Sequence, residues 1–183
     1  INIDRGPLAA DKVRFVGDPV AFVVAETKAQ AKDAAEAVEM EIDALDAVTE
    51  ASAAAAPGAP LLYDHVPGNV VLDYRYGDAD KVAEAFARAA HVTTLNIRNN
   101  RIVVCAMEPR SAIGAWDAAE GRYILHVGSQ GVFGLRNQMA NDILKVPVEK
   151  VRILTGNVGG SFGMKASAYP EYACVLHAAK VLG

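Results

Sequence analysis

The sequence has few cysteines and histidines and no excess of positive charge. Its two cysteines, Cys105 and Cys174, have no second cysteine or histidine at metal-ligand spacing, so neither a disulfide framework nor a zinc site is indicated. Both are expected to be reduced core residues. The net charge of −4 lacks the basic excess of a nucleic-acid-binding protein. No apolar run approaches the roughly 20 residues that cross a bilayer, and the N-terminal INIDRGPLAADK lacks the pattern of a signal peptide. These absences favour a cytoplasmic protein that binds no nucleic acid and does not span a membrane.

What is present is the composition of a globular protein. Of the 183 residues, 52% are hydrophobic and 22% are charged, which is enough apolar material to fill a core. Ile1 stands where an initiator methionine would be, and the chain stops at VLG directly after an apolar helical run. Both ends therefore predict a fragment of a longer protein.

The first third of the chain predicts a strand, a helix and a second strand. Residues 20–25 are β-branched and apolar after the turn Gly17-Asp18-Pro19. Thr27 and Gln30 have the spacing of a capping box, and apolar residues then recur at helical spacing, at Ala31, Ala34, Ala35 and Val38. Residues 39–45 alternate apolar and acidic side chains, as a half-buried strand does. Together these segments predict a βαβ unit.

A linker is expected at residues 50–60, where small residues, prolines and a glycine replace any core pattern. We therefore place the first domain at residues 1–60 and the second at residues 61–183. The second domain begins with an irregular segment, after which a short helix is predicted through residues 78–90 and a strand from His91 to Ile97.

The second half predicts a hairpin and another βαβ unit. Segments 111–116 and 122–128 read as two strands joined by a loop that ends in glycine. A helix that Pro147 ends has Leu135, Met139 and Ile143 on one face, and the following VRILTG is predicted to be a strand. After a glycine-rich connection, Pro170 and Glu171 suit the first turn of a final helix.

That connection, Gly159-Gly160-Ser161-Phe162-Gly163-Met164-Lys165, carries the most informative motif. Glycines let a backbone approach a ligand closely and expose its N–H groups, so an anionic cofactor site is reasonable. The spacing is neither that of a P-loop nor that of a dinucleotide fingerprint. From these residues alone, a purely structural loop is the simpler interpretation.

Three longer segments carry a resemblance to a known family. Residues 129–183, from SQGVFGLRNQMANDILKV through VGGSFGMKASAYPEYACVLHAAKVLG, closely resemble the start of the molybdopterin-binding domain in the family of xanthine dehydrogenase, aldehyde oxidase and carbon monoxide dehydrogenase. VGDPVAFVVAETKAQAKDAAEAVEMEIDALDAV resembles that family's α/β hammerhead domain, and NNRIVVCAMEPRSAIGAW resembles the link between them. The ending AYPEYACVLHAAKVLG is most similar to the carbon monoxide dehydrogenase branch. The resemblance implies an α/β fold with a hammerhead-type βαβ domain before the start of a molybdopterin-binding domain.

The resemblance also implies which residues bind the molybdenum cofactor. Gln130 matches a glutamine whose amide lies beside the oxo ligand of molybdenum, with a capping or solvent-facing glutamine as the alternative. Gly160, Phe162 and Gly163 match residues that lie against the metal and its dithiolene, and Ser161 could donate a further hydrogen bond. Phe162 could instead be ordinary core. The family holds its metal through pterin sulfurs, so no side chain here is expected to be a metal ligand.

Further matched residues have roles that the sequence leaves open. Glu108 and Arg110 could form a buried ion pair near the entrance of the cofactor domain, although a structural turn at Pro109 is an equal alternative. Lys165 matches a frequent family lysine, and a cation beside an anionic cofactor would be favourable. We interpret the four histidines as structural.

The family's general base and most of its cofactor loops lie beyond the matched region, so the resemblance implies no catalytic residue in this chain. Ala166 stands where purine-oxidising relatives have a glutamate, which argues against a purine substrate. The parent enzyme would oxidise carbon monoxide, an aldehyde or an N-heterocycle with oxygen from water, and would pass electrons to iron–sulfur and FAD-binding subunits or domains. The isolated fragment is expected to be inactive. A non-catalytic module that docks other subunits and binds no redox cofactor is the alternative.

Overall fold

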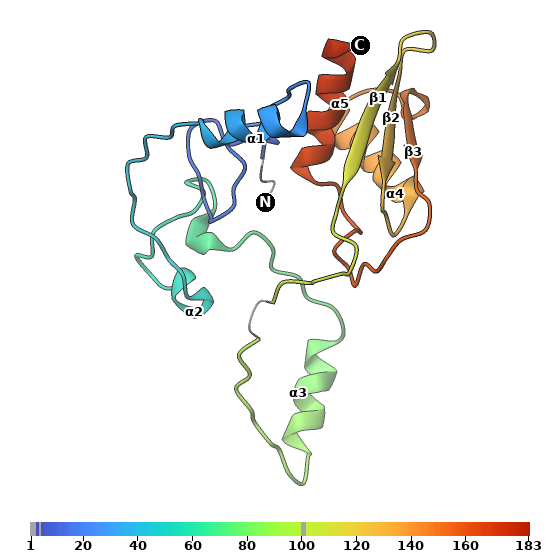
Figure 1. Ribbon diagram of the computed structural model, residues 1–183. Coiled ribbons are helices and arrows are strands. Elements are labelled where there is room, and N and C mark those ends of the chain that lie inside the picture. The colour runs from blue at the N-terminus through green and yellow to red at the C-terminus, as the bar shows by residue number, and fades with distance from the viewer. Residues whose placement is uncertain (1–2, 4, 100–101) are drawn as a thin grey trace. The chain divides into compact units, whose positions relative to one another are not determined.

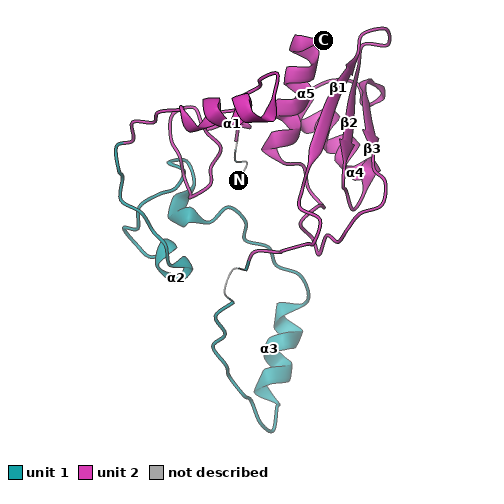
Figure 2. Cartoon of the chain, viewed as in Figure 1, with its two compact units in different colours: residues 1–3, 43–102 teal, residues 4–42, 103–183 magenta. Residues whose placement is uncertain are grey.

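The computed structural model describes residue 3, residues 5–99 and residues 102–183 (Figure 1). Ile1 and two residues of the linking segment 99–116 lie outside the described residues. The chain divides into two compact units, one of residues 1–3 and 43–102, the other of residues 4–42 and 103–183 (Figure 2). The second unit carries the sheet and the glycine-rich loop, and is therefore the unit that bears on function.

A three-stranded sheet in the order β1-β2-β3 forms the centre of residues 103–183. Strands β1 (Ala112–Asp117) and β2 (Arg122–Val127) form the predicted antiparallel hairpin. Strand β3 (Val151–Leu154) lies parallel to β2, so the connection between them is the predicted βαβ crossover. The hairpin and the second βαβ unit are thus confirmed.

The crossover helix changes its winding part of the way along. It begins as α4 (Val132–Asn137), continues as the π-helix η2 (Gln138–Leu144), and ends at Lys145 in the left-handed region with φ 53°. Leu135 and Met139 are buried as their spacing predicts, whereas Ile143 is 38% exposed. The π-helix has hydrogen bonds between residues i and i+5, so its side chains are rotated about the axis relative to those of an α-helix. This rotation accounts for the exposure of Ile143. A 3-10 turn, η3 (Val148–Lys150), leads into β3.

Helix α5 (Pro170–Leu182) packs against β1 at very close range. A Cβ atom on Gly114 would lie 2.5 Å from the carbonyl oxygen of Val175, so only glycine fits at this point of β1. Pro170 and Glu171 occupy the first turn as expected. Helices α4, η2 and α5 and one face of the sheet share a single core, in which Leu125 and Leu176 are fully buried.

The predicted first βαβ unit is present only as its helix. Helix α1 (Lys28–Glu36) begins with the predicted capping box, in which the Gln30 amide donates to Thr27 Oγ1 at 3.2 Å and the Thr27 amide donates to Gln30 Oε1 at 3.0 Å. Residues 20–25 and 39–45 form no strand in the described part of the chain, contrary to the prediction. Their composition favours strands, but a strand requires a hydrogen-bonded neighbour, and neither segment has one among the described residues.

Residues 43–102 contain short helices without a sheet among the described residues. Helix α2 (Ala51–Ala54) is a single turn inside the predicted linker, η1 (Pro67–Asn69) is a 3-10 turn, and α3 (Ala79–Ala87) is the predicted short helix. Asp78 caps α3 by accepting from the Lys81 amide at 3.0 Å. The strand expected from His91 to Ile97 is absent, again because it has no neighbour. No helix in the described ranges is both long enough and apolar enough to span a bilayer.

Candidate functional site

The glycine-rich loop leaves β3 and returns to α5 with three residues in the left-handed region of backbone space. Gly160 and Gly163 have φ of 97° and 94°, which explains why glycine is needed at both positions. Phe162 has φ 51°, and its side chain is 79% exposed. The alternative that Phe162 is a core residue is therefore wrong. A strained, exposed aromatic residue is typical of a functional loop.

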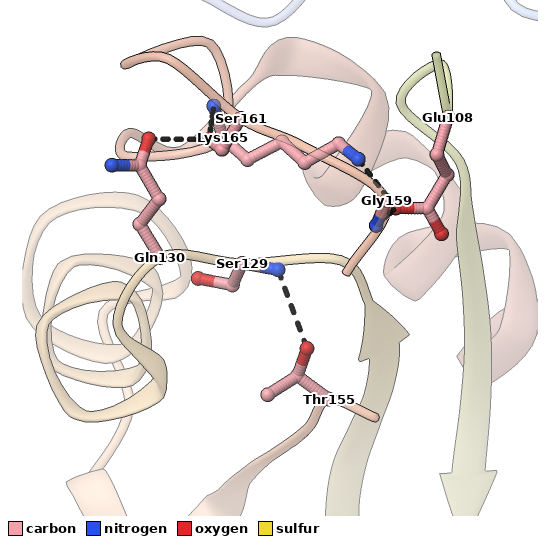
Figure 3. A network of polar contacts seen from close by, with 7 residues as sticks. All are labelled: Glu108, Ser129, Gln130, Thr155, Gly159, Ser161 and Lys165. Atoms are coloured by element: carbon pink, nitrogen blue, oxygen red, sulfur yellow. Dashed lines mark hydrogen bonds and ion pairs between the residues drawn. The ribbon is translucent and has the colours of Figure 1, made fainter. Parts of the chain in front are cut away.

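Glu108 anchors the start of this loop from the segment before β1 (Figure 3). Its amide donates to the carbonyl of Gly159 at 3.1 Å, and its carboxylate accepts from the Gly159 amide at 2.7 Å. The same oxygen accepts from Lys165 Nζ at 2.6 Å. The hydrogen bond from Lys165, and then that from Gly159, hold the pKa of Glu108 below its usual range. The Lys165 side chain is 1% exposed, so the pair ties both ends of the loop to one carboxylate.

Arg110 is paired elsewhere, so the proposed Glu108–Arg110 ion pair is wrong. Its guanidinium carbon lies 3.4 Å from the centre of the Tyr169 ring, and its nitrogen lies 2.9 Å from the carboxylate of Glu171. The Tyr169 hydroxyl donates to the Met164 carbonyl at 2.5 Å. Arg110 therefore supports the far end of the loop where α5 begins. No sequence pattern identified Tyr169, because its contacts depend on the folded chain.

Gln130 reaches the loop through two hydrogen bonds that join distant parts of the sequence, of which Figure 3 shows the one made by its side chain. Its backbone amide donates to the carbonyl of Lys165 at 3.1 Å. Its side-chain Oε1 accepts from the hydroxyl of Ser161, and Ser161 Oγ in turn accepts from the Lys165 amide at 3.0 Å. The segment around Gln130 is also fixed by Thr155, whose Oγ1 accepts from the Ser129 amide at 3.3 Å. The structure therefore brings Gln130 and the loop residues 160–163 together.

The loop presents backbone donors that the chain itself leaves unused. The amides of Gly160, Ser161, Phe162 and Gly163 have no hydrogen-bond acceptor within residues 102–183 or elsewhere in the described chain. Beside them, the side-chain nitrogen of Gln130 also has no acceptor among the described residues. Successive free amides in a loop of this kind bind anionic or oxygen-rich groups. The donor set thus suits a ligand that presents several oxygen atoms.

An open hollow of about 400 Å³ lies at the carboxyl ends of β2 and β3. Its wall includes Glu108, but not Gln130 or residues 160–163. The exposed ring of His126 also lines it. The remaining residues of the wall come from the start of β1 and from the ends of β2 and β3: Ser111, Ala112, Ile113, Val127, Gly128, Leu154, Thr155, Gly156 and Asn157.

The two cysteines differ in their surroundings. Both are free thiols, but Cys105 is exposed, so the expectation that it is a core residue is wrong. Cys174 is half-buried in α5, and burial, followed by the charge of Glu171, raises the pKa of its thiol. Neither thiol lies in the group formed by Gln130 and the loop.

Comparison with known proteins identifies the family. Residues 62–183 match the molybdopterin cofactor-binding domain, and residues 2–46 match the a/b hammerhead domain of aldehyde oxidase and xanthine dehydrogenase. The carbon monoxide dehydrogenase large chain of Hydrogenophaga pseudoflava is 30% identical over 96% of this chain and 23% of its own. The nicotine 6-hydroxylase large subunit of Paenarthrobacter nicotinovorans is 32% identical over 90% of this chain and 20% of its own.

Solved structures agree with these matches. Quinoline 2-oxidoreductase from Pseudomonas putida 86 superposes with a TM-score of 0.82 at 32% identity, over 97% of this chain and 22% of that one. The Cu,Mo-CO dehydrogenase superposes with a TM-score of 0.84 at 28% identity, over 97% and 24%. The chain thus spans about a fifth to a quarter of the length of the relatives it matches. It belongs to the family of molybdopterin-binding large subunits that includes carbon monoxide dehydrogenase and xanthine dehydrogenase, with a hammerhead segment followed by a molybdopterin-binding segment.

Proposed function

We propose that this chain forms part of the cofactor site of a molybdenum hydroxylase, and that Gln130, Gly160, Ser161, Phe162 and Gly163 are its cofactor-binding residues. The observation that supports this most directly is the row of free backbone amides beside the free amide nitrogen of Gln130. A molybdopterin cofactor presents phosphate and oxo oxygen atoms, which are acceptors for such donors. The residues present therefore fit the group that the family binds.

Each of these residues has a definite task in this proposal. The backbone amides of Gly160, Ser161, Phe162 and Gly163 donate hydrogen bonds and need no proton transfer to do so. The exposed ring of Phe162 offers apolar surface that excludes water from one side of the site. Gln130 donates from its side-chain nitrogen. When bound, the cofactor supplies the two-electron oxidation chemistry, and the protein supplies binding and orientation.

The substrate and partners follow from the family and are part of the same proposal. We propose a small substrate, either carbon monoxide or an aldehyde or N-heterocycle, and oxygen drawn from water. Electrons would leave through iron–sulfur and FAD-binding subunits or domains, in the cytoplasm. We also propose that residues 1–60 and 61–183 are the two domains, with the hammerhead segment in the first. Ala166 supports a substrate other than a purine.

A non-catalytic docking module is the second candidate. The observation that favours it is the apolar face of α3, where Val82 is 53% and Phe86 is 61% exposed. Such a face is typical of a surface that contacts another protein or another part of the same protein. This candidate predicts no molybdenum in any preparation.

Metal analysis separates the two candidates. The protein in its natural length, purified from a host that makes the cofactor, is expected to contain about one molybdenum atom per chain by mass spectrometry. Gly163→Ala places a side chain at φ 94° and should lower that ratio severalfold. Gly134→Ala is the matched control, because that glycine has open space around it inside α4 and should leave the ratio unchanged. The 183-residue chain alone is expected to hold no stoichiometric molybdenum and to show no turnover. A natural-length protein without molybdenum would refute the proposal.

A further inference from the structure

The hydroxyl of Ser161 has two hydrogen-bond partners, of which one can only donate. On one side is the backbone N–H of Lys165, at 3.0 Å from Oγ. On the other side is the side-chain amide of Gln130. A backbone N–H can only donate, so it occupies a lone pair of the hydroxyl oxygen. The single hydroxyl proton of Ser161 is then available for Gln130.

This arrangement favours one orientation of the Gln130 amide, which has one acceptor, Oε1, and one donor, Nε2. The hydroxyl oxygen keeps a second lone pair for Nε2, but its own proton would then have no acceptor among the described residues, whereas Oε1 accepts that proton. Oε1 therefore faces Ser161, and Nε2 with its two protons points away from it (Figure 3). Without Ser161, a half-turn about the last side-chain bond would exchange the two atoms at little cost.

Lys165 holds Ser161 and Gln130 in this relation. Its N–H donates to the hydroxyl, and its carbonyl accepts from the Gln130 backbone amide at 3.1 Å. Its own position is fixed because its Nζ lies 2.6 Å from the carboxylate of Glu108. Gln130 is thus tied at both its backbone and its side chain to the same turn of the loop.

We propose that Ser161 is a positioning residue that sets the orientation of the Gln130 amide, so that Gln130 presents a hydrogen-bond donor, and not an acceptor, to an oxygen atom of the cofactor. The inference rests on the proposed function for the identity of the ligand. It goes beyond that function because it assigns the direction of the amide to one hydroxyl group. A reversed amide would turn an acceptor toward an electron-rich oxygen atom and would repel it.

The test observes the amide itself and does not depend on activity. The protein in its natural length is labelled with 15N at glutamine Nε2, and Gln130→Leu identifies the Gln130 signal. We expect the wild-type Gln130 side chain to show a high heteronuclear NOE, because its Oε1 is held. Ser161→Ala should reduce that NOE to the value of a mobile side chain, and Ser161→Thr, which keeps the hydroxyl, should restore it.

Two internal controls separate this effect from a general loosening of the loop. Gln138 accepts from the Ala168 amide at 3.1 Å without touching Ser161, so its NOE should not change in any variant. Exchange of the Lys165 amide should become about tenfold faster in Ser161→Ala. Exchange of the Ala166 amide, which donates to the Gly163 carbonyl, should not. Ser161→Gly removes the same hydroxyl and is used in place of Ser161→Ala if the alanine variant does not fold.

The outcomes are distinct. A lower NOE of the Gln130 side chain in Ser161→Ala, together with its recovery in Ser161→Thr, supports the inference. A Gln130 signal that is unchanged in Ser161→Ala or Ser161→Gly overturns it, as does an equal loss at Gln138 or a failure of threonine to restore the signal. If the signals behave as expected but the wild-type protein contains no molybdenum, the positioning role stands and the proposed function fails. If molybdenum is present but Gln130 is unaffected, the function stands and the positioning role fails.

Discussion

Gly159 is the position where a small change should disturb the loop most directly. In Gly159→Ala, the added Cβ would lie 2.7 Å from the Cβ of Glu108, whereas ordinary contacts begin at 3.4 Å. One of the two must therefore move by about 0.7 Å, the difference between these distances. A shift of that size along the contact would lengthen the bond from the Gly159 amide to the carboxylate from 2.7 Å to about 3.4 Å, beyond useful hydrogen-bond range.

We expect Gly159→Ala to lower the free energy of unfolding by about 1–3 kcal/mol, the usual effect of overpacking. Urea unfolding followed by the fluorescence of Trp116, the only tryptophan, measures this quantity. Gly131→Ala is the matched control, because Gly131 has extended backbone with φ −170° and nothing within 4 Å of an added Cβ. Because Gly131 is also the N-cap of α4, where alanine is less favourable than glycine, that variant should change the free energy of unfolding by less than about 1 kcal/mol. The reasoning fails if the two variants are equally stable.

Three other predictions concern single groups. Folding lowers the pKa of the Glu108 carboxyl, so the ionised carboxylate stabilises the protein above the ordinary carboxyl pKa, and this stabilisation is lost as the pH falls through the folded pKa. The free energy of unfolding of the wild type should therefore fall more steeply in acid than that of Glu108→Gln. Urea midpoints measured across pH test this. Phe162→Gly should raise the free energy of unfolding by about 1 kcal/mol by relieving the left-handed backbone, while molybdenum content of the natural-length protein falls. Cys105 is exposed, whereas burial raises the pKa of the Cys174 thiol, so Cys105 should react first with a thiol reagent at neutral pH. Mass spectrometry of partly labelled protein measures the order, and finding Cys174 modified first would contradict the prediction.

Local patterns in the sequence were sufficient for the elements whose partners are close along the chain. The capping box of α1 joins residues three apart, and the hairpin of β1 and β2 pairs neighbouring segments, so both could be predicted. The strands expected at residues 20–25 and 39–45 depend on a neighbour that periodicity does not identify, and these predictions were wrong.

The same distinction applies to the candidate site. The glycine-rich loop was singled out by its residues and Gln130 by the family resemblance, whereas Glu108 had Arg110, two residues away, as one possible partner and a structural turn at Pro109 as the alternative. The actual partner is Lys165, 57 residues further along. Charge and spacing cannot choose between these cations, because the choice depends on how the loop folds back beside Glu108. The roles of Arg110 and Tyr169 were missed for the same reason, since the two residues are 59 positions apart in the sequence.

Lys165 uses three separate groups to contact three different segments: its amide with Ser161, its carbonyl with Gln130, and its side chain with Glu108. Most surface connections tolerate changes in length, because their ends stay fixed while the tip adjusts. The connection from β3 to α5 lacks that tolerance. Inserting or deleting one residue between Ser161 and Lys165 would displace all three contacts at once. The length of this loop is therefore as constrained as its composition, and engineered changes to the family's chemistry in this chain are better made by substitution than by loop exchange.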